Sequence, residues 1–479
     1  MIRSSLLLGL LLAPRAWAVD VTLHPGDDVG QLTSNPGPGS TITFTDGTYE
    51  LDNTISWTGA GTQDQPIVFQ AQQGTTPVLQ FSGGGNGIRL AASQFVTIQG
   101  LVIENTDDFY NSDRQTGLVI DSSSDVTVEN VEIRHVGGTG LQLTGNDTNL
   151  TLHHVHIHDT RDGSGLYSGC YDASCWTQDS AIDTCWIHDI RGNGARGIYV
   201  ENGGQGLSIV DNVVYQVDGG GIRTASTEFG DPNTVERNVV WSTVGYGVAV
   251  SGAATVRNNI VFNVDGVGIY TQDNDQGSFG NLAIANNTVT DTSDWGIQVR
   301  GWAGYDGLVL TNNAVANPVG LAFHEGEGDL DENVLVASNI FTGWVDAPDL
   351  DPASGAYAPG GGTGDFANAE SWDFYPSSSS LLINAGDGDQ AAWVPATDFS
   401  GAPRDAAAPD VGAYEYLGST NPGWVIKEGF KVPGYQDTTG QDLGGCGCSK
   451  SGSESAAWGL PLLLLAVARR RRGTPSGEA

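Results

Sequence analysis

The stretch GIYVENGGQGLSIVDNVVYQVDGGGIRTASTEFGDPNTVERNVVWSTVGYGVAV, residues 197–250, contains the same short pattern three times. Each copy begins with a glycine followed by alternating apolar residues, at Gly197, Gly221 and Gly247. Asn212 and Asn238 stand between these glycines, each beside an apolar string. Because side chains alternate between the two faces of a strand, each copy indicates two or three short strands that end in turns.

The pattern continues over about residues 117–345, with asparagines spaced 26, 21, 28, 26 and 26 residues apart. Such a small unit cannot bury its apolar face alone, whereas stacked units can. We therefore predict an all-β chain that forms a right-handed parallel β-helix with about 21–30 residues per coil. A β-propeller, the alternative, needs repeats of roughly 40 residues or more. The repeat glycines are Gly117, Gly140, Gly197, Gly221, Gly247, Gly268, Gly296 and Gly320, and the asparagines are Asn212, Asn238, Asn259, Asn287, Asn313 and Asn339.

The asparagines are expected to lie above one another at one bend of every coil. Their side-chain amides can then hydrogen-bond along the stack and satisfy polar groups that the bend would leave unpaired in the interior.

Two stretches before this region, residues 47–74 and 95–106, resemble the first coils of chondroitinase-B-like and alginate-lyase-like enzymes. These enzymes share the β-helix of the pectin-lyase-like superfamily, which the whole repeat pattern resembles. The resemblance implies a polysaccharide substrate, a lysine base, an arginine, and calcium at the substrate carboxylate. The first lysine of this chain is Lys427, so no residue of the predicted coils matches the lysine base.

The chain carries 56 acidic and 20 basic residues, a formal net charge of −36. A field of this sign repels nucleic acid, so we expect no nucleic-acid partner and a soluble monomer. Residues 1–18 have a positive start, an apolar run and a small-residue exit, which predicts a secretory signal peptide. In an oxidising compartment, Cys170 and Cys175 are expected to pair across a short loop.

Residues 346–416 resemble the closing segment of surface β-helix proteins with a choice-of-anchor Q domain. The resemblance implies that this segment covers the open end of the solenoid, with Arg404 paired to Asp398 or Asp410. The matching residues are Asn384, Ala385, Gly386, Asp398, Gly401, Pro403, Arg404, Pro409, Asp410, Gly412, Ala413, Tyr414 and Glu415.

Residues 446–479 combine Cys446 and Cys448 with a 13-residue apolar run and four consecutive arginines. The run is shorter than the roughly 20 residues that span a bilayer. The three parts resemble the Myxo-CTERM sorting tag. This resemblance implies recognition by export and sorting machinery, removal of the tail, and attachment to the outer cell surface through Cys446 or Cys448. Residues 417–445 would be the linker. An ordinary membrane tail is the alternative.

The repeat register predicts which side chains point outward from one strand of each coil. Tyr199, Glu201 and Arg223 then form a patch on neighbouring coils and are our catalytic candidates, because tyrosine stacks on sugars, arginine binds carboxylates and glutamate transfers protons. We predict substrate binding by further outward residues. These are Tyr270, Gln298 and Arg300. An ordinary solvated sheet face is the alternative.

The longest interruption of the repeat, residues 165–196, adjoins a histidine-rich stretch at 153–162. His158 and Asp183 complete the catalytic candidates, because histidines and carboxylates beside a Tyr–Arg patch suit an active site. His156 should share a face with His158, and His188 should align with His158 in the next coil. These histidines could bind a metal, although no standard zinc spacing is present.

Two further features allow two readings each. Acidic turns at residues 273–277 and 325–333 make calcium possible, although neither has the spacing of a standard calcium loop. An outward column formed by Tyr215, Trp241 and Phe262 fits either a carbohydrate platform or a dry contact with a loop.

Together these features predict an exported, surface-anchored β-helix that binds and cleaves polysaccharide, with lyase-like or hydrolase-like chemistry. The alternative is a non-catalytic solenoid that binds glycans or mediates adhesion.

Overall fold

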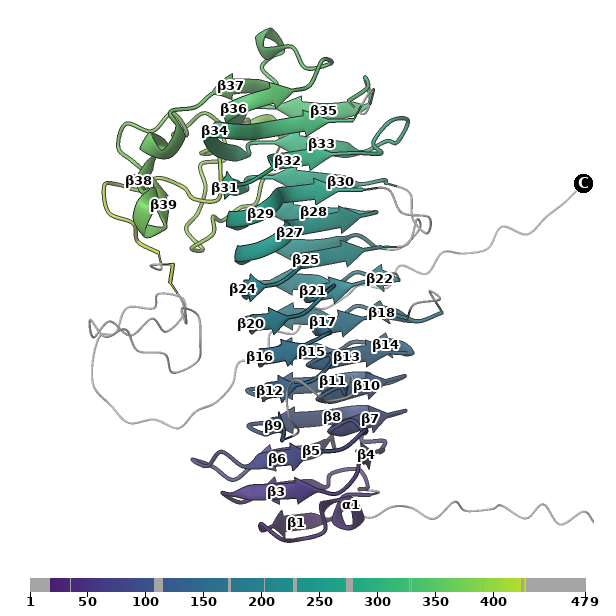
Figure 1. Ribbon diagram of the computed structural model, residues 1–479. Coiled ribbons are helices and arrows are strands. Elements are labelled where there is room, and N and C mark those ends of the chain that lie inside the picture. Colours follow the sequence, from purple (N-terminus) through teal and green to yellow (C-terminus); the bar gives the residue numbers. More distant parts are fainter. Residues whose placement is uncertain are drawn as a thin grey trace, which may run out of the picture. The chain divides into compact units, whose positions relative to one another are not determined.

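The structure is a computed structural model. It describes residues 18–34, 36–106, 115–170, 174–201, 203–226, 231–272, 279–326, 328, 330–390, 392–423 and 426–427. Short parallel strands stack coil upon coil over residues 20–359 (Figure 1). The only α-helix within the described residues is α1 (Val29–Leu32), which lies at the N-terminal end of the stack. The predicted all-β parallel β-helix is therefore confirmed.

Each coil contributes strands to three columns. Column 1 forms one sheet, and columns 2 and 3 share the other. Column 1 consists of β1 (Asp20–Leu23), β2 (Thr41–Phe44), β5 (Ile67–Ala71), β8 (Gln94–Gln99), β11 (Ser124–Glu129), β15 (Thr151–His153), β19 (Ala181–Asp183), β23 (Ser208–Val210), β26 (Asn233–Glu236), β28 (Ala254–Arg257), β30 (Leu282–Ala285), β33 (Leu308–Thr311) and β35 (Val334–Ala337). Three short strands extend its sheet: β14 (Asn146–Thr148), β18 (Trp176–Gln178) and β22 (Gly204–Gln205).

From β2 onward, strands of columns 2 and 3 follow each strand of column 1 until the last coil. Column 2 consists of β3 (Thr48–Leu51), β6 (Val78–Phe81), β9 (Val102–Asn105), β12 (Glu132–Val136), β16 (His156–Arg161), β20 (Trp186–Arg191), β24 (Val213–Val217), β31 (Thr288–Thr292) and β37 (Tyr357–Pro359). Column 3 consists of β4 (Ile55–Trp57), β7 (Ile88–Ala91), β10 (Leu118–Asp121), β13 (Leu141–Thr144), β17 (Ser164–Ser168), β21 (Arg196–Val200), β25 (Gly220–Ala225) and β32 (Trp295–Val299). Four long strands run through both columns: β27 (Val239–Ser251), β29 (Ile260–Thr271), β34 (Ala314–Glu325) and β36 (Asn339–Asp346).

The repeat glycines stand at the start of column 3 because the chain passes too close to column 2 for a side chain. A Cβ at Gly221 would lie 2.4 Å from Cγ1 of Val240 and 2.5 Å from the carbonyl oxygen of Gly247. On β34 this place belongs to Ala322, which is fully buried, and not to Gly320. The register therefore differs by two residues from the one that the sequence pattern indicates there.

We expect Gly221→Ala to lower the free energy of unfolding by about 1–3 kcal/mol, because the added methyl group overpacks a closed interior. Urea unfolding followed by circular dichroism measures the loss. Gly280→Ala is the matched control, since a Cβ there meets nothing within 4 Å. Equal stability of the two variants would contradict the steric account of the glycine column.

The asparagines form a continuous buried ladder at the bend between columns 1 and 2, as predicted. The side-chain amide nitrogen of Asn212 donates to Oδ1 of Asn238 at 3.0 Å, and Asn238 donates to Oδ1 of Asn259 at 3.0 Å. Equivalent bonds of 2.9–3.0 Å continue through the remaining asparagines to Asn339. Each asparagine also donates to a backbone oxygen of another strand, so its amide is satisfied inside an apolar core.

Residues after the last coil fold back along the side of the stack and cover the outer face of column 2. This cover includes the antiparallel strands β38 (Phe366–Asn368) and β39 (Asp373–Pro376), which lie level with β29 and β31 in Figure 1. It also includes three short 3-10 turns, η2 (Gly362–Asp365), η3 (Ala369–Ser371) and η4 (Gly388–Gln390). A further turn of this kind, η1 (Pro352–Ser354), precedes the cover.

Polar bonds fasten the cover to the coils. Arg404 donates to Oδ1 of Asn258 at 2.8 Å and pairs with Glu415 at 3.3 Å. The predicted ion pair of Arg404 with Asp398 or Asp410 is therefore wrong. Arg404 reaches Asp410 only through the backbone oxygen, at 3.1 Å, because the Asp410 carboxylate accepts bonds from backbone amides instead.

The described residues contain no helix that is both long and apolar enough to cross a membrane. Cys170 and Cys175 form the predicted disulfide, while Cys185 is a buried free thiol. The contact pattern separates residues 1–444 from 445–479, and the second unit, with Cys446 and Cys448, lies outside the described residues.

Candidate functional site

The predicted patch forms on the outer face of column 3. Tyr199 on β21 pairs in register with Arg223 on β25, as predicted, and with Tyr167 on β17. The hydroxyl of Tyr167 donates to the carboxylate of Glu201, and the hydroxyl of Tyr199 donates to Oε1 of Glu201 at 3.3 Å. Two phenols from adjacent coils therefore meet at one carboxylate.

Two guanidinium groups flank the Tyr199 ring. The Cζ atom of Arg223 lies 5.4 Å from the ring centroid, and that of Arg196 lies 5.2 Å from it. Arg196 donates to the backbone oxygens of Gly194 and Ala195. Within the described part of the chain, neither arginine forms an ion pair, whereas six other arginines of the coils do. On a strongly acidic protein, this face therefore offers free positive charge.

A third tyrosine completes the group. The ring of Tyr246 lies over Gly220, where a Cβ would come within 2.0 Å of its Cζ atom. Burial raises the pKa of Tyr246, although the nearby Arg196 and Arg223 act in the opposite direction. We call Tyr167, Arg196, Tyr199, Glu201, Arg223 and Tyr246 the Tyr–Arg cluster.

The phenols of the Tyr–Arg cluster stay protonated. Burial and the hydrogen bond to Glu201 raise the pKa of Tyr167 well above its usual range. Burial also raises the pKa of Tyr199, with the charges of Arg223 and Arg196 opposing it and that of Glu201 adding to it. Both hydroxyls are therefore proton donors at neutral pH.

Sequence reasoning missed Tyr167, because the start of its coil was assigned to an interruption of the repeat. Gly165 and Leu166 in fact begin an ordinary column 3 strand, β17, and β18, β19 and β20 follow in regular order. The glycine–apolar pair was the available signal, but Ser168 replaces the second apolar residue and hid it.

The predicted substrate-binding residues lie farther along the same face. Tyr270 stands two coils beyond Arg223, with Ala249 between them, and its hydroxyl donates to Gln272 at 3.1 Å. Gln298 is only 5% exposed, because its neighbours cover it. Arg300 is exposed just beyond the end of β32.

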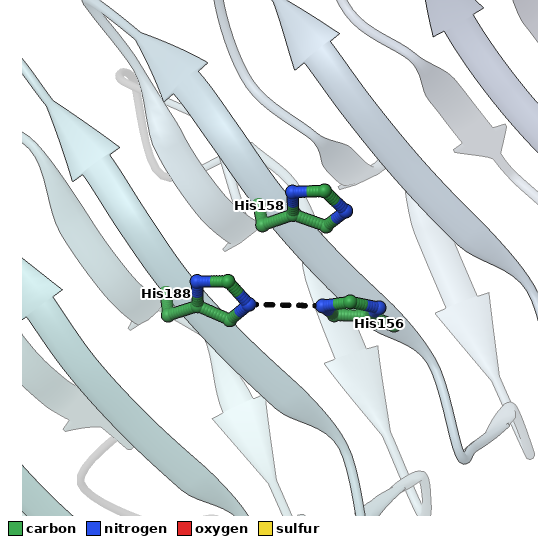
Figure 2. A group of neighbouring side chains, drawn as sticks. All are labelled: His156, His158 and His188. Carbon is green, nitrogen blue, oxygen red and sulfur yellow. Dashed lines mark hydrogen bonds between the residues drawn. The ribbon is translucent and has the colours of Figure 1, made fainter. Parts of the chain in front are cut away.

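His158 belongs to a different face, the outer side of column 2. It pairs in register with His188, and His156 on the same strand points to the same side, as predicted (Figure 2). Nε2 of His156 lies 2.9 Å from Nε2 of His188. Nε2 of His158 lies 3.2 Å from Oε1 of Glu132. We call His156, His158 and His188 the histidine cluster.

Charge is unevenly distributed over the histidine cluster. Burial, together with the nearby His158 and His188, lowers the pKa of His156 to about 3. Burial also lowers the pKa of His158, but hydrogen bonds to Glu132 and Asp159 outweigh it and raise that pKa overall. The bond from His158, with help from Arg134 and against burial, lowers the pKa of Glu132 to about 2.

Stacked rings continue from the histidine cluster under the cover. Successive ring centroids along His188, Tyr215, Trp241 and Phe262 are 4.8, 4.4 and 5.7 Å apart. Tyr215, Trp241 and Phe262 are buried against Phe366, Phe374 and other residues of the cover. Of the two readings of this column, the dry contact is therefore correct.

Asp183 lies on column 1, a third surface. Its carboxylate bonds Nδ1 of His153 at 3.0 Å on the neighbouring strand. The five predicted catalytic residues therefore do not form one site. Tyr199, Glu201 and Arg223 meet on column 3, while sharp bends at Asp159 (φ 51°) and Asp162 (φ 57°) turn the chain between His158 and that column.

Among the described residues, no group of carboxylates forms a complete set of calcium ligands. The Tyr–Arg cluster holds one carboxylate beside two guanidinium groups, which does not fit a cation that takes six to eight oxygens. Residues 273–277 lie outside the described residues. In the other acidic turn, Asp331 accepts bonds from the backbone amides of Gly304 and Asn333, and residues 327 and 329 lie outside the described residues.

Two family models match the chain. "Pel9A-like, right handed beta helix region" covers residues 20–174, and "Right handed beta helix region" covers residues 178–315. Together with the strand pairing, these matches show that the chain forms a right-handed parallel β-helix. Its N-terminal coils are those that match the Pel9A-like model. No curated protein matches.

Several solved structures are similar to the chain. The pectate lyase Pel9A has 16% identity and a TM-score of 0.49, over 84% of this chain and 97% of that one. The A-module of the Azotobacter vinelandii mannuronan C-5 epimerase AlgE4 has 15% identity and a TM-score of 0.47, over 64% and 86%. An alginate lyase from Paenibacillus sp. str. FPU-7 has 16% identity and a TM-score of 0.40, over 66% and 99%. Identities this low carry no information about a shared substrate.

Proposed function

We propose that the protein binds a polysaccharide rich in uronic acids along column 3 and cleaves it at the Tyr–Arg cluster. One observation carries this proposal: within the described residues, the guanidinium groups of Arg196 and Arg223 form no ion pair with a carboxylate, although the protein is strongly acidic. Such groups bind carboxylates in a bidentate manner. The matches to a family model named for Pel9A support the same class of substrate.

The cluster also holds the groups that an elimination needs. Glu201 would accept the proton from the sugar carbon next to the carboxylate, and Arg223 would stabilise the charge that this carboxylate gains. Tyr167 or Tyr199 would donate a proton to the departing glycosidic oxygen as the carbon–oxygen bond breaks and a carbon–carbon double bond forms. In the free protein both phenols already point at Glu201, so substrate would have to displace at least one of these bonds.

The length of the face suits a chain of sugars. Tyr167 and Tyr270 are four coils apart, which places their strands about 19 Å from each other. A chain laid along the axis would meet Tyr199 and Arg223 at its centre and Tyr270 farther along.

Incubation of the purified protein with uronate and neutral polysaccharides, with and without calcium, tests the proposal. We expect ultraviolet absorbance from unsaturated uronate products together with new reducing ends. Reducing ends without that absorbance would indicate a hydrolase and contradict the elimination step. Binding without products would favour the glycan-binding or adhesive solenoid, and absence of binding would overturn the proposal.

We further propose that residues 1–18 direct export and that the chain is anchored at the outer cell surface through Cys446 or Cys448 after its tail is removed. The support is the residue pattern of the choice-of-anchor Q-like segment and of the tail. We expect the protein in the cell-surface fraction, and its release into the medium when both Cys446 and Cys448 are replaced by serine. A double variant that keeps its surface location would contradict anchoring through these thiols.

A further inference from the structure

We propose that the histidine cluster on column 2 is a zinc-binding site, separate from the Tyr–Arg cluster. The three rings form a nearly regular triangle, with centroids 4.3 Å apart for His156 and His158, 5.1 Å for His156 and His188, and 5.2 Å for His158 and His188. One ligand atom from each ring lies within 4.8 Å of the others. Figure 2 shows all three on one side of β16 and β20, with the bond between His156 and His188 dashed.

In two of these rings, Nδ1 is hydrogen-bonded to a carboxylate. Nδ1 of His158 lies 2.8 Å from Asp159, and Nδ1 of His188 lies 2.8 Å from Asp189. Carboxylates in this position fix the tautomer and orientation of metal-binding histidines and raise their basicity. Nε2 of His158 and of His188 is thereby left as the ligand atom, and Nε2 of His156 lies beside that of His188.

The local sequence builds this arrangement twice. Residues 156–161 read HIHDTR and residues 186–191 read WIHDIR, so each coil places a His–Asp pair at the end of its outward row. Asp159 and Asp189 both adopt the left-handed conformation, with φ of 51° and 53°, and this bend turns each carboxylate back onto the preceding histidine. Two coils with the same bend therefore deliver two imidazoles with the same orientation.

The rest of the surroundings also suit a metal ion. Oε1 of Glu132 lies 3.2 Å from Nε2 of His158 and 2.7 Å from Arg134, so the other carboxylate oxygen would be the fourth ligand. The indole of Trp186 stacks on His156 at 4.0 Å and limits the movement of that ring. The side chains of His158 and His188 are 15% and 12% exposed, so an ion can reach them from solvent.

Zinc requires the three rings to shift, because their ligand atoms lie within 4.8 Å of one another and not at one uniform spacing. With bonds of 2.0–2.1 Å, tetrahedral zinc holds its nitrogen ligands roughly 3.3 Å apart. The Nε2 atoms of His156 and His188, now 2.9 Å apart, would separate slightly, and the proton that they share would leave to solvent. Imidazole ligands suit zinc, whereas calcium and magnesium prefer oxygen.

Equilibrium titration with zinc, in competition with a chromophoric chelator, tests the site in protein that carries no histidine purification tag. The Cys446→Ser, Cys448→Ser background removes the thiolates of the tail. We expect one zinc ion per chain, no competition from calcium, and a loss of affinity of at least about a hundredfold in His156→Gln and His188→Gln. Asp189→Asn should weaken binding roughly 10–100-fold. His153→Gln, in the same coil but on column 1, should bind as tightly as the parent.

X-ray absorption of the zinc-loaded parent counts the imidazole ligands without relying on any variant. Three imidazoles would support the site even if the histidine variants unfold, which circular dichroism would reveal. Absence of stoichiometric zinc in the parent, or unchanged affinity in a folded His188→Gln, would overturn the proposal.

Discussion

Replacing Arg223 with alanine is expected to weaken binding of a uronate oligosaccharide roughly 10–100-fold. A hydrogen bond to a charged group contributes about 1.5–3 kcal/mol, and each 1.4 kcal/mol corresponds to a factor of ten in affinity. The full loss should appear because Arg223 forms no ion pair within the described residues that its removal would leave unbalanced. Isothermal titration calorimetry with a defined oligosaccharide measures the change, and turnover should fall at least as far.

The conservative variant separates charge from geometry. Arg223→Lys keeps the positive charge but loses the planar fork that matches a carboxylate, so we expect affinity between those of the parent and Arg223→Ala. Arg257→Ala is the matched control, because Arg257 lies on column 1 and pairs with Glu236 at 2.9 Å. Unchanged affinity in Arg223→Ala, or an equal loss in Arg257→Ala, would remove the Tyr–Arg cluster from consideration.

The fold could be predicted from the sequence because equivalent residues of successive coils stack in columns and therefore recur at a regular spacing. A glycine, a branched apolar residue and an asparagine recur in every central coil, and each recurrence reports a contact with the next coil. The periodic signal was lost where one residue departed from the pattern. Ser168 concealed the coil of Tyr167, and Gly320 imitated the repeat glycine two residues before Ala322.

The site was only partly readable, because outward residues carry no periodic constraint. The register correctly brought Tyr199 and Arg223 together, since their strands are neighbours in a regular part of the stack. It could not show that bends of single residues separate the outer faces of columns 2 and 3. His158 and Tyr199 are therefore close in the repeat order and yet belong to different surfaces.

Asparagines that belong to the repeat pattern also hold the cover in place. Asn258, Asn286 and Asn312 each precede a ladder asparagine and adopt the left-handed conformation. Each donates its amide hydrogen to a backbone oxygen of the cover, at 2.8, 3.0 and 3.3 Å. The Asn–Asn doublets therefore mark the coils whose bends hydrogen-bond to the cover. The coils of Tyr215 and Trp241 have Asp211 and Arg237 at this place and contact the cover through apolar packing instead.

Substitution of a ladder asparagine is expected to have the largest effect on stability. Oδ1 of Asn259 accepts bonds from the backbone and the side chain of Asn238, and its amide donates to Val235 and Asn287, all at 2.9–3.0 Å. Asn259→Ala leaves at least two of these buried groups without a partner, at about 1–3 kcal/mol each, so we expect a loss of about 2–6 kcal/mol. Urea unfolding measures it.

The exposed Asn146→Ala on β14 is the control and should change the free energy of unfolding by less than about 0.5 kcal/mol. Position matters as well as residue type. Below Asn212 the ladder ends at Cys185, whose backbone amide donates to Oδ1 of Asn212 at 2.8 Å. Coils below this point have Val155 and Val131 at the same bend and stay closed without an amide. The bend can therefore be filled either by the asparagine ladder or by apolar side chains. If Asn259→Ala lowers the free energy of unfolding no more than Asn146→Ala does, the hydrogen bonds of the ladder contribute nothing beyond apolar packing.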